Sequence, residues 1–251
     1  MLQVVIIGSG NVAQHFIKAL ANSANAKVVQ AFARHLQDLE HLLPATAITS
    51  SYESLKEADV YIIAVKDDAI AHVSSQLPFT GRLVVHTSGS SGMEQLDNKN
   101  RRGVFYPLQT FSKNKEIDFY VVPLCLESEQ EADYQILEDL ANGLSRSIYK
   151  IDSEQRKALH VAAVFVNNFT NHMYTIGDEI CSQNNIPFGI LGPLIQETAD
   201  KINTLSPKNA QTGPALRHDG QTIQKQVDLL EKENHKELYT LITQSIQQTN
   251  E

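Results

Sequence analysis

The residues whose types and spacing most clearly suggest a chemical role lie near the start of the chain, in a short glycine-containing segment. This segment reads Gly8-Ser9-Gly10-Asn11-Val12-Ala13. A Gly-x-Gly-x-x-Ala sequence between a strand and a helix is typical of sites that bind a dinucleotide. Gly8 permits a tight turn, Gly10 leaves room for a pyrophosphate, and Ala13 lets the helix pack closely on the strand. Unpaired N–H groups at the start of the helix then bind the phosphates, helped by the helix dipole.

A basic pair, Arg34 and His35, follows the next apolar run, Lys27 to Phe32. Dinucleotide-binding folds that prefer NAD place Asp or Glu here to bind the ribose 2′-hydroxyl. No acid occurs between Val28 and Gln37, and the guanidinium of Arg34 suits a 2′-phosphate instead. The alternative is a solvated surface arginine. We therefore predict NADP as the cofactor, bound in part by Arg34 and His35.

Two polar residues of a later apolar segment could supply acid–base chemistry. His160 and Asn167 lie seven residues apart, close to two helical turns, so they share one face of a helix. His160 would donate a proton to the oxygen or nitrogen formed by hydride transfer, and Asn167 would orient a substrate oxygen. We expect both to face a cleft between two domains. The alternative is a hydrogen-bonded face against another helix or a dimer partner.

Ser88 and Arg217 are further candidates. Ser88 follows an apolar strand, where its hydroxyl could meet a nicotinamide or a substrate, or could simply belong to a turn. Arg217 lies after a Gly-Pro turn and could bind a substrate carboxylate, pair with Asp219 or cap a helix. Tyr106 and Gln109 could face the same crevice, although packing and loop roles are slightly favoured. His86, at the end of a strand, is interpreted as structural.

These residues need a scaffold that brings distant segments together. Alternating strands and helices predict an α/β fold of the Rossmann type, with a mostly parallel sheet. The expected strands are residues 2–7, 27–32, 47–49, 60–65 and 83–86, with further strands near 103–111, 120–126 and 147–151. The expected helices are 11–22, 35–43, 52–58, 69–76 and 129–142. Ligands of such sheets bind beyond the carboxyl ends of the strands, which adds Val65, Lys66 and Thr87 to the cofactor site.

The pattern changes at Asp152, which forms a capping-box sequence with Gln155. A long helix to about Cys181 carries a stripe that we expect to pack against other helices: Leu159, Ala162, Val166 and Phe169. Helices follow at about 191–204, from Asp219 to about 232, and at 235–247. We therefore expect an NADP-binding domain over residues 1–151 and an all-helical domain over residues 152–251.

Composition narrows the function. The 251 residues carry a net charge of −8, which argues against general binding of nucleic acid or anionic membranes. No apolar stretch is long enough to span a bilayer, and because Met1 leads straight into the first strand we expect no signal peptide. Cys125 and Cys181 have no metal-ligand spacing, so we expect reduced thiols, a cytoplasmic protein and no metal site.

Several motifs together resemble a group of two-domain NADP oxidoreductases whose helical domain has no assigned function. Besides residues 8–13, they are Ala64 to Asp67, Val85 to Gly89, Phe105 to Phe111, His160 to Ala163 and Thr212 to Asp219. The wider relatives include pyrroline-5-carboxylate reductase and the 6-phosphogluconate and 3-hydroxyisobutyrate dehydrogenases. The resemblance implies a homodimer formed through the helical domains. It does not supply the substrate.

One departure bears on catalysis. The hydroxyacid dehydrogenases use a Lys and an Asn one turn apart on the long helix, whereas Val161 stands four residues after Lys157 here. We expect an NADP-dependent oxidoreductase that transfers hydride between NADP(H) and a small carbonyl, hydroxy-acid or imine substrate in the cleft between the domains. The alternative is a non-catalytic NADP-binding sensor or interaction protein.

Overall fold

The computed structural model describes residues 1–113 and 115–249, which divide into two compact units. The units are Met1–Phe165 and Val166–Glu251, so the division falls later than the expected boundary at residue 151. The reason is that helix α4 (Ser153–Ala163) packs on the sheet of the first unit, where Leu159 contacts the cluster of Val104, Tyr106 and Cys125. Asp152 caps α4 in the expected capping box with Gln155.

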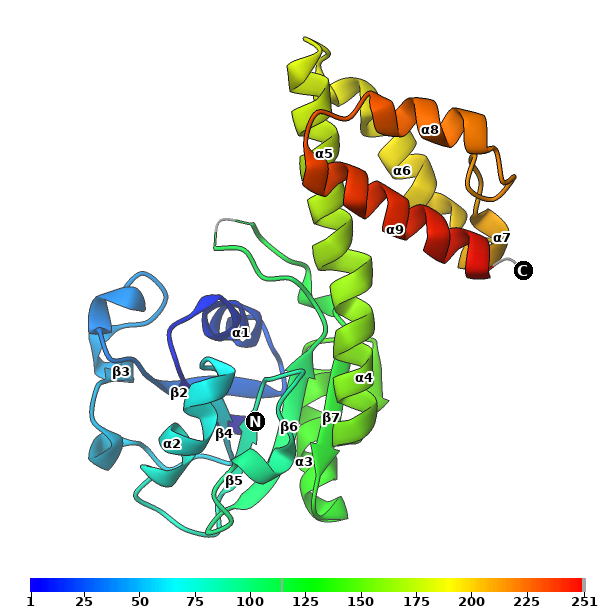
Figure 1. Ribbon diagram of the computed structural model, residues 1–251. Coiled ribbons are helices and arrows are strands. Elements are labelled where there is room, and N and C mark those ends of the chain that lie inside the picture. The colour runs from blue at the N-terminus through cyan, green and yellow to red at the C-terminus, as the bar shows by residue number, and fades with distance from the viewer. Residues whose placement is uncertain (114, 250–251) are drawn as a thin grey trace. The chain divides into compact units, whose positions relative to one another are not determined.

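The first unit is built on an eight-stranded sheet with the order β3-β2-β1-β4-β5-β6-β7-β8 (Figure 1). The strands are β1 (Leu2–Ile7), β2 (Ala26–Phe32), β3 (Ile48–Thr49), β4 (Val60–Ile63), β5 (Leu83–His86), β6 (Arg101–Pro107), β7 (Leu124–Ser128) and β8 (Ile148–Lys150). All neighbours are parallel except β6 and β7, which are antiparallel. The Rossmann-type, mostly parallel sheet is therefore confirmed.

Both faces of this sheet are covered. Alternate residues of β1 show this: Val4 and Ile6 join a core with helices α1 (Asn11–Ala21) and α3 (Glu131–Asn142), whereas Val5 and Ile7 join a core with α2 (Ile70–Ser75). A strand buried on both faces needs an unbroken apolar run, and this is why β1 shows no polar alternation.

Some local predictions were wrong. The helix expected at residues 35–43 is only the 3₁₀ turn Leu36–Asp38, after which Leu39 is buried in the core. The helix expected at 52–58 is likewise a 3₁₀ turn, Tyr52–Ser54. The strand expected from residue 120 begins at Leu124, because Asp118 caps a 3₁₀ turn over Phe119–Val121.

The second unit contains helices and no strands among its described residues, as expected. Its helices are α5 (Thr170–Gln183), α6 (Gly192–Lys201), α7 (Pro207–Ala210), α8 (Gly220–Asp228) and α9 (Glu233–Thr249). A π-helical segment, Val164–Phe169, lies between α4 and α5. None of the described helices is long and apolar enough to cross a membrane.

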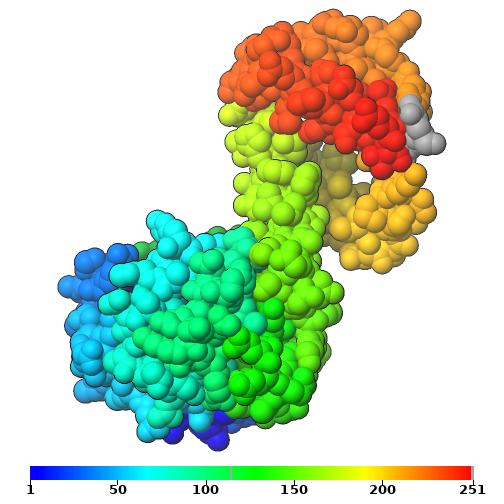
Figure 2. Space-filling view, turned by 60° about the horizontal axis from the view of Figure 1, so that its bottom comes forward, coloured from blue at the N-terminus to red at the C-terminus, as the bar shows by residue number. Residues whose placement is uncertain are grey.

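Packing within the second unit is sparse. Of its described residues, only Cys181, Ala215 and His235 are buried. In the space-filling view a hollow separates the gold surface around α6 and α7 from the red surface of α9 (Figure 2). The expected burial of Val166 and Phe169 against other helices is wrong for the single chain, in which both are exposed.

Candidate functional site

The glycine-rich loop joins β1 to α1 in a conformation that its sequence dictates. Gly8 has φ +134°, and a Cβ there would overlap the backbone carbonyl of Ala64 at the end of β4. Gly10 is the N-cap of α1, and a Cβ there would meet nothing within 4 Å. The first turn of α1 has no acid and no side-chain cap. Open space beside uncapped N–H groups fits a bound pyrophosphate.

The remaining residues of the loop hold it in place. The hydroxyl of Ser9 donates to the carboxylate of Asp38 at 2.9 Å, and the amide of Gln14 donates to the carbonyl of Ser9 at 2.9 Å. The amide of Asn11 donates to the carbonyl of Phe111 at 2.9 Å. Val12 and Ala13 pack into the core. Because the side chains of the loop make these contacts within the protein, we expect a ligand to bind the peptide N–H groups of the loop.

Arg34 and His35 are exposed directly after β2. Burial raises the pKa of Tyr52, and the positive charge of Arg34 partly offsets that rise, which shows that Arg34 lies near this ring. Arg34 forms no ion pair with any described residue, so its charge remains available to an anion. Asp38 was not predicted as a site residue, because a helix was expected where the 3₁₀ turn brings this acid to Ser9.

The other expected cofactor residues lie at the same edge of the sheet. The register aligns Ile7 with Ile63, Ile63 with His86 and His86 with Val104, so the segments that follow these residues meet there. Val65 packs beside Gly8 and Lys66 is exposed.

Two contacts join these loops. The backbone N–H of Thr87 donates to the carbonyl of Ile63 at 3.2 Å. Asp67 accepts a hydrogen bond from the hydroxyl of Ser90, which ties the loop after β4 to the loop after β5.

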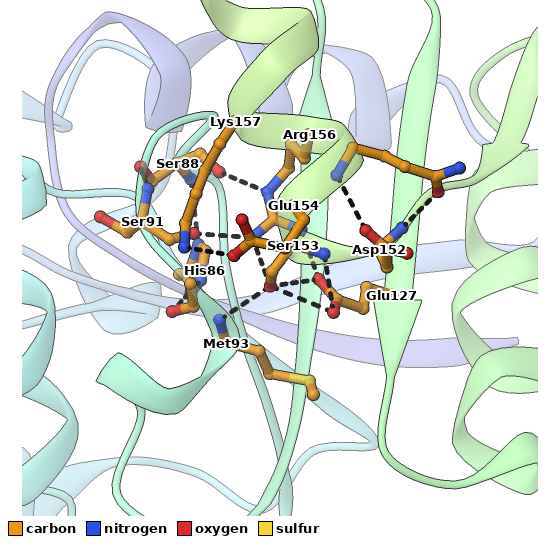
Figure 3. Close-up of polar contacts among 12 residues, drawn as sticks. His86, Ser88, Ser91, Met93, Glu127, Asp152, Ser153, Glu154, Arg156 and Lys157 are labelled. Atoms are coloured by element: carbon orange, nitrogen blue, oxygen red, sulfur yellow. Dashed lines mark hydrogen bonds and ion pairs between the residues drawn. The ribbon is translucent and has the colours of Figure 1, made fainter.

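A buried arginine fixes the loop after β5 (Figure 3). Arg156 of α4 is fully buried and forms an ion pair with Glu127 of β7. Its remaining N–H groups donate to the carbonyls of Ser88 at 3.2 Å and Ser91 at 2.6 Å and to the hydroxyl of Ser153 at 3.1 Å. The carbonyls of one loop thus bind a cation that belongs to the helix packed on the sheet.

His86 is structural, as expected. Its Nδ1 accepts from the backbone N–H of Ser88 at 3.1 Å, so its Nε2 carries the proton and donates to the carbonyl of Gly92 at 3.2 Å. Burial, with a smaller effect of Arg156, lowers the pKa of His86 to about 4. The ring is therefore neutral at pH 7.

Ser88 is buried, and its hydroxyl stabilises the turn after β5. Its Oγ accepts from the backbone N–H groups of Ser90 at 3.2 Å and Ser91 at 2.9 Å. These contacts favour the turn role that was the alternative at the sequence level. A catalytic role of Ser88 stays a prediction.

His160 faces a tyrosine of the sheet. The Tyr106 hydroxyl lies 3.2 Å from His160 Nδ1. Burial raises the pKa of Tyr106 to about 12, so the phenol keeps its proton and can either donate to His160 Nδ1 or accept a proton from it. A Cβ at Gly89 would overlap both rings, so the loop backbone lies directly against the pair. The packing role favoured for Tyr106 from the sequence did not include this hydrogen bond.

Asn167 and Arg217 belong to the second unit. Asn167 is exposed, and its amide is 3.4 Å from Asn168. It lies in the π-helical segment, whose wider turn alters the two-turn register assumed between residues 160 and 167. Arg217 is exposed, while Asp219 caps α8 through Thr222. Their substrate roles stay predictions.

Comparison with known proteins now adds to this geometry. Residues 3–89 match the family described as NADP oxidoreductase, coenzyme F420-dependent, and residues 122–246 match a domain of unknown function, DUF2520. A solved structure of a proposed NADP oxidoreductase from Bacteroides fragilis is 38% identical, covers 98% of each chain and has a TM-score of 0.87. The chain belongs to this family of two-domain NADP oxidoreductases. The resemblance inferred from the motifs is thus confirmed.

More distant structures share the fold. An imine reductase from Myxococcus stipitatus in complex with NADP⁺ is 17% identical over 98% of this chain and 93% of its own, with a TM-score of 0.68. A pyrroline-5-carboxylate reductase from Coxiella burnetii is 17% identical over 99% and 97%, with a TM-score of 0.57. None of the curated proteins compared with the chain matches it. The oxidoreductase family is thus established.

Proposed function

We propose that the protein is an NADP(H)-dependent oxidoreductase that transfers hydride between the cofactor and a small carbonyl, hydroxy-acid or imine substrate. The observation that carries this proposal is the Tyr106–His160 hydrogen bond at the edge of the sheet that also holds the glycine-rich loop. A protein that only binds the dinucleotide has no use for a positioned acid there.

Each part of this edge has a task. The N–H groups at the start of α1 would bind the pyrophosphate, and Arg34 would bind the 2′-phosphate. When bound, the nicotinamide supplies or accepts the hydride. In the reductive direction His160, as the imidazolium, would give its Nε2 proton to the substrate oxygen or nitrogen as the hydride reaches the carbon, and the neutral imidazole left behind would take up a proton from water. The Tyr106 hydroxyl would accept from Nδ1–H of that imidazolium and so hold the ring in place.

A substrate screen tests the proposal. Oxidation of NADPH is followed by absorbance over panels of small aldehydes, ketones, keto acids and cyclic imines. With any substrate found, His160→Ala should lower kcat at least a hundredfold, as expected for loss of a general acid, and leave the Kd of NADPH within about threefold. His172→Ala is the matched control, because His172 is an exposed histidine of the adjoining helix α5 and should retain turnover.

The second candidate is a non-catalytic NADP sensor, favoured by one observation. Lys157 forms a surface ion pair with Glu154, and Val161 replaces the Asn of the hydroxyacid dehydrogenases, so their catalytic pair is missing. Tight NADPH binding without turnover on any panel would support this candidate and contradict the enzyme.

We also propose a homodimer formed through the helical unit. Its support is the sparse packing described above, together with large exposed apolar side chains such as Val166 at 75% and Leu229 at 82% exposure. Light scattering on the full chain should give twice the mass of one chain, and a monomer at micromolar concentration would contradict the proposal.

A further inference from the structure

We propose that Asp38 is a second determinant of cofactor choice and that it acts against Arg34. This inference rests on the proposed binding of NADP(H) by the glycine-rich loop. It assigns to one residue of this chain a role that neither the fingerprint nor the family comparison gives: a carboxylate that opposes a 2′-phosphate and suits a ribose 2′-hydroxyl.

The first step is that Asp38 is held at the loop rather than merely near it. Its carboxylate accepts the hydroxyl of Ser9 at 2.9 Å, inside the Gly8–Gly10 turn. The amide of Gln14 joins the carbonyl of Ser9 at 2.9 Å to that of Asp38 at 3.4 Å. Leu39, fully buried, anchors the next residue in the core. One contact thus holds the carboxylate itself, and two hold the backbone that carries it.

The second step concerns charge. Asp38 is exposed and forms no ion pair with any described residue, and Arg34, four positions earlier, is likewise without one. Both therefore keep their charge for a ligand. The segment between the end of β2 and the glycine-rich loop holds one cation and one anion, at the place where dinucleotide-binding folds receive the adenosine ribose.

The third step compares the two cofactors. A 2′-phosphate gains from Arg34 and is repelled by the Asp38 carboxylate. A 2′-hydroxyl can donate a hydrogen bond to that carboxylate, as it does in folds with an acid after the second strand. Both effects of Asp38 favour NADH over NADPH. The preference for NADPH is therefore smaller than Arg34 alone would give.

Binding titrations test this without a substrate. The Kd values of NADPH and NADH are measured by nucleotide fluorescence for the unmutated chain, Asp38→Asn and Glu40→Gln. The Asn amide oxygen can still accept the Ser9 hydroxyl, so Asp38→Asn removes the charge and keeps the contact. We expect the affinity ratio of NADPH to NADH to rise about tenfold, equal to about 1.4 kcal/mol. The rise should shrink with added salt, because the carboxylate is exposed.

Glu40→Gln is the matched control, because it removes an exposed carboxylate two residues further along the same segment. It should change the ratio by less than about twofold. An unchanged ratio in Asp38→Asn, or an equal rise in both variants, would overturn the inference while leaving NADP(H) binding intact. If neither nucleotide binds the unmutated chain, the proposed function and this inference both fail.

Discussion

Replacing Glu127 by Gln should destabilise the protein far more than the same change two residues later. Arg156 is fully buried, and the side chain of Glu127 is 15% exposed, so their ion pair is largely removed from water. Breaking such a pair leaves a buried charge without its partner and costs about 3–5 kcal/mol. We expect the lower end of this range, because Arg156 keeps its bonds to the carbonyls of Ser88 and Ser91.

The chain contains its own control for this change. Glu129 pairs with Arg102, and those side chains are 35% and 23% exposed. Exposed pairs contribute about 0–1 kcal/mol, so Glu129→Gln should cost less than about 1 kcal/mol. The free energy of unfolding at pH 7 is measured for the three proteins by urea titration with far-ultraviolet circular dichroism, at one protein concentration. Equal losses of unfolding free energy in the two variants, or a loss under about 1 kcal/mol for Glu127→Gln, would refute the stabilising role of the buried Arg156–Glu127 pair.

Three further predictions concern cofactor and pH. Arg34→Ala should erase most of the preference for NADPH over NADH; equal titration curves in the unmutated protein would contradict the 2′-phosphate site. Gly10→Val should abolish binding of both nucleotides yet leave the circular dichroism spectrum unchanged, because a Cβ there meets no protein atom within 4 Å; unchanged affinity would make the loop merely structural. The pKa of His86 falls to about 4 on folding, so its contribution to the free energy of unfolding is full above pH 6.5 and declines toward pH 4. The free energy of unfolding should therefore fall by about 2 kcal/mol between pH 7 and 5, and His86→Asn should remove most of that fall.

Local features of the fold were predictable from the sequence because they depend on neighbouring residues. The apolar run of β1, the Gly8 turn and the capping box at Asp152 each follow from a short pattern with a single structural solution. The segment after Arg34 was not predictable in this way. Its residues suit a helix, but burial of Leu39 in the core selects a 3₁₀ turn, and tertiary contacts override helix propensity.

The site shows the same division, since its decisive contacts join residues far apart in the chain. The Arg156–Glu127 pair spans 29 positions and the Tyr106–His160 bond spans 54. The spacing of apolar and polar residues along the sequence does not predict contacts over such separations. One signal was nevertheless present: Arg156 and His160 are four residues apart, so they share a helical face. The predicted polar face ran from His160 forward to Asn167, which lies in the π-helical segment, and did not include Arg156.

Arg156, one turn before His160 on α4, explains how the loop of the site is held in place. Arg156 binds the carbonyls of Ser88 and Ser91, and one turn later His160 lies against Gly89, between those two serines. A single face of α4 therefore positions the loop and carries the proposed acid. Because a Cβ at Gly89 would overlap the His160 ring, the loop backbone lies directly against the imidazole, and a shift of the loop toward α4 would displace the imidazole relative to Tyr106. The buried charge of Arg156, which is costly for stability alone, is then explained by the geometry that it imposes on His160.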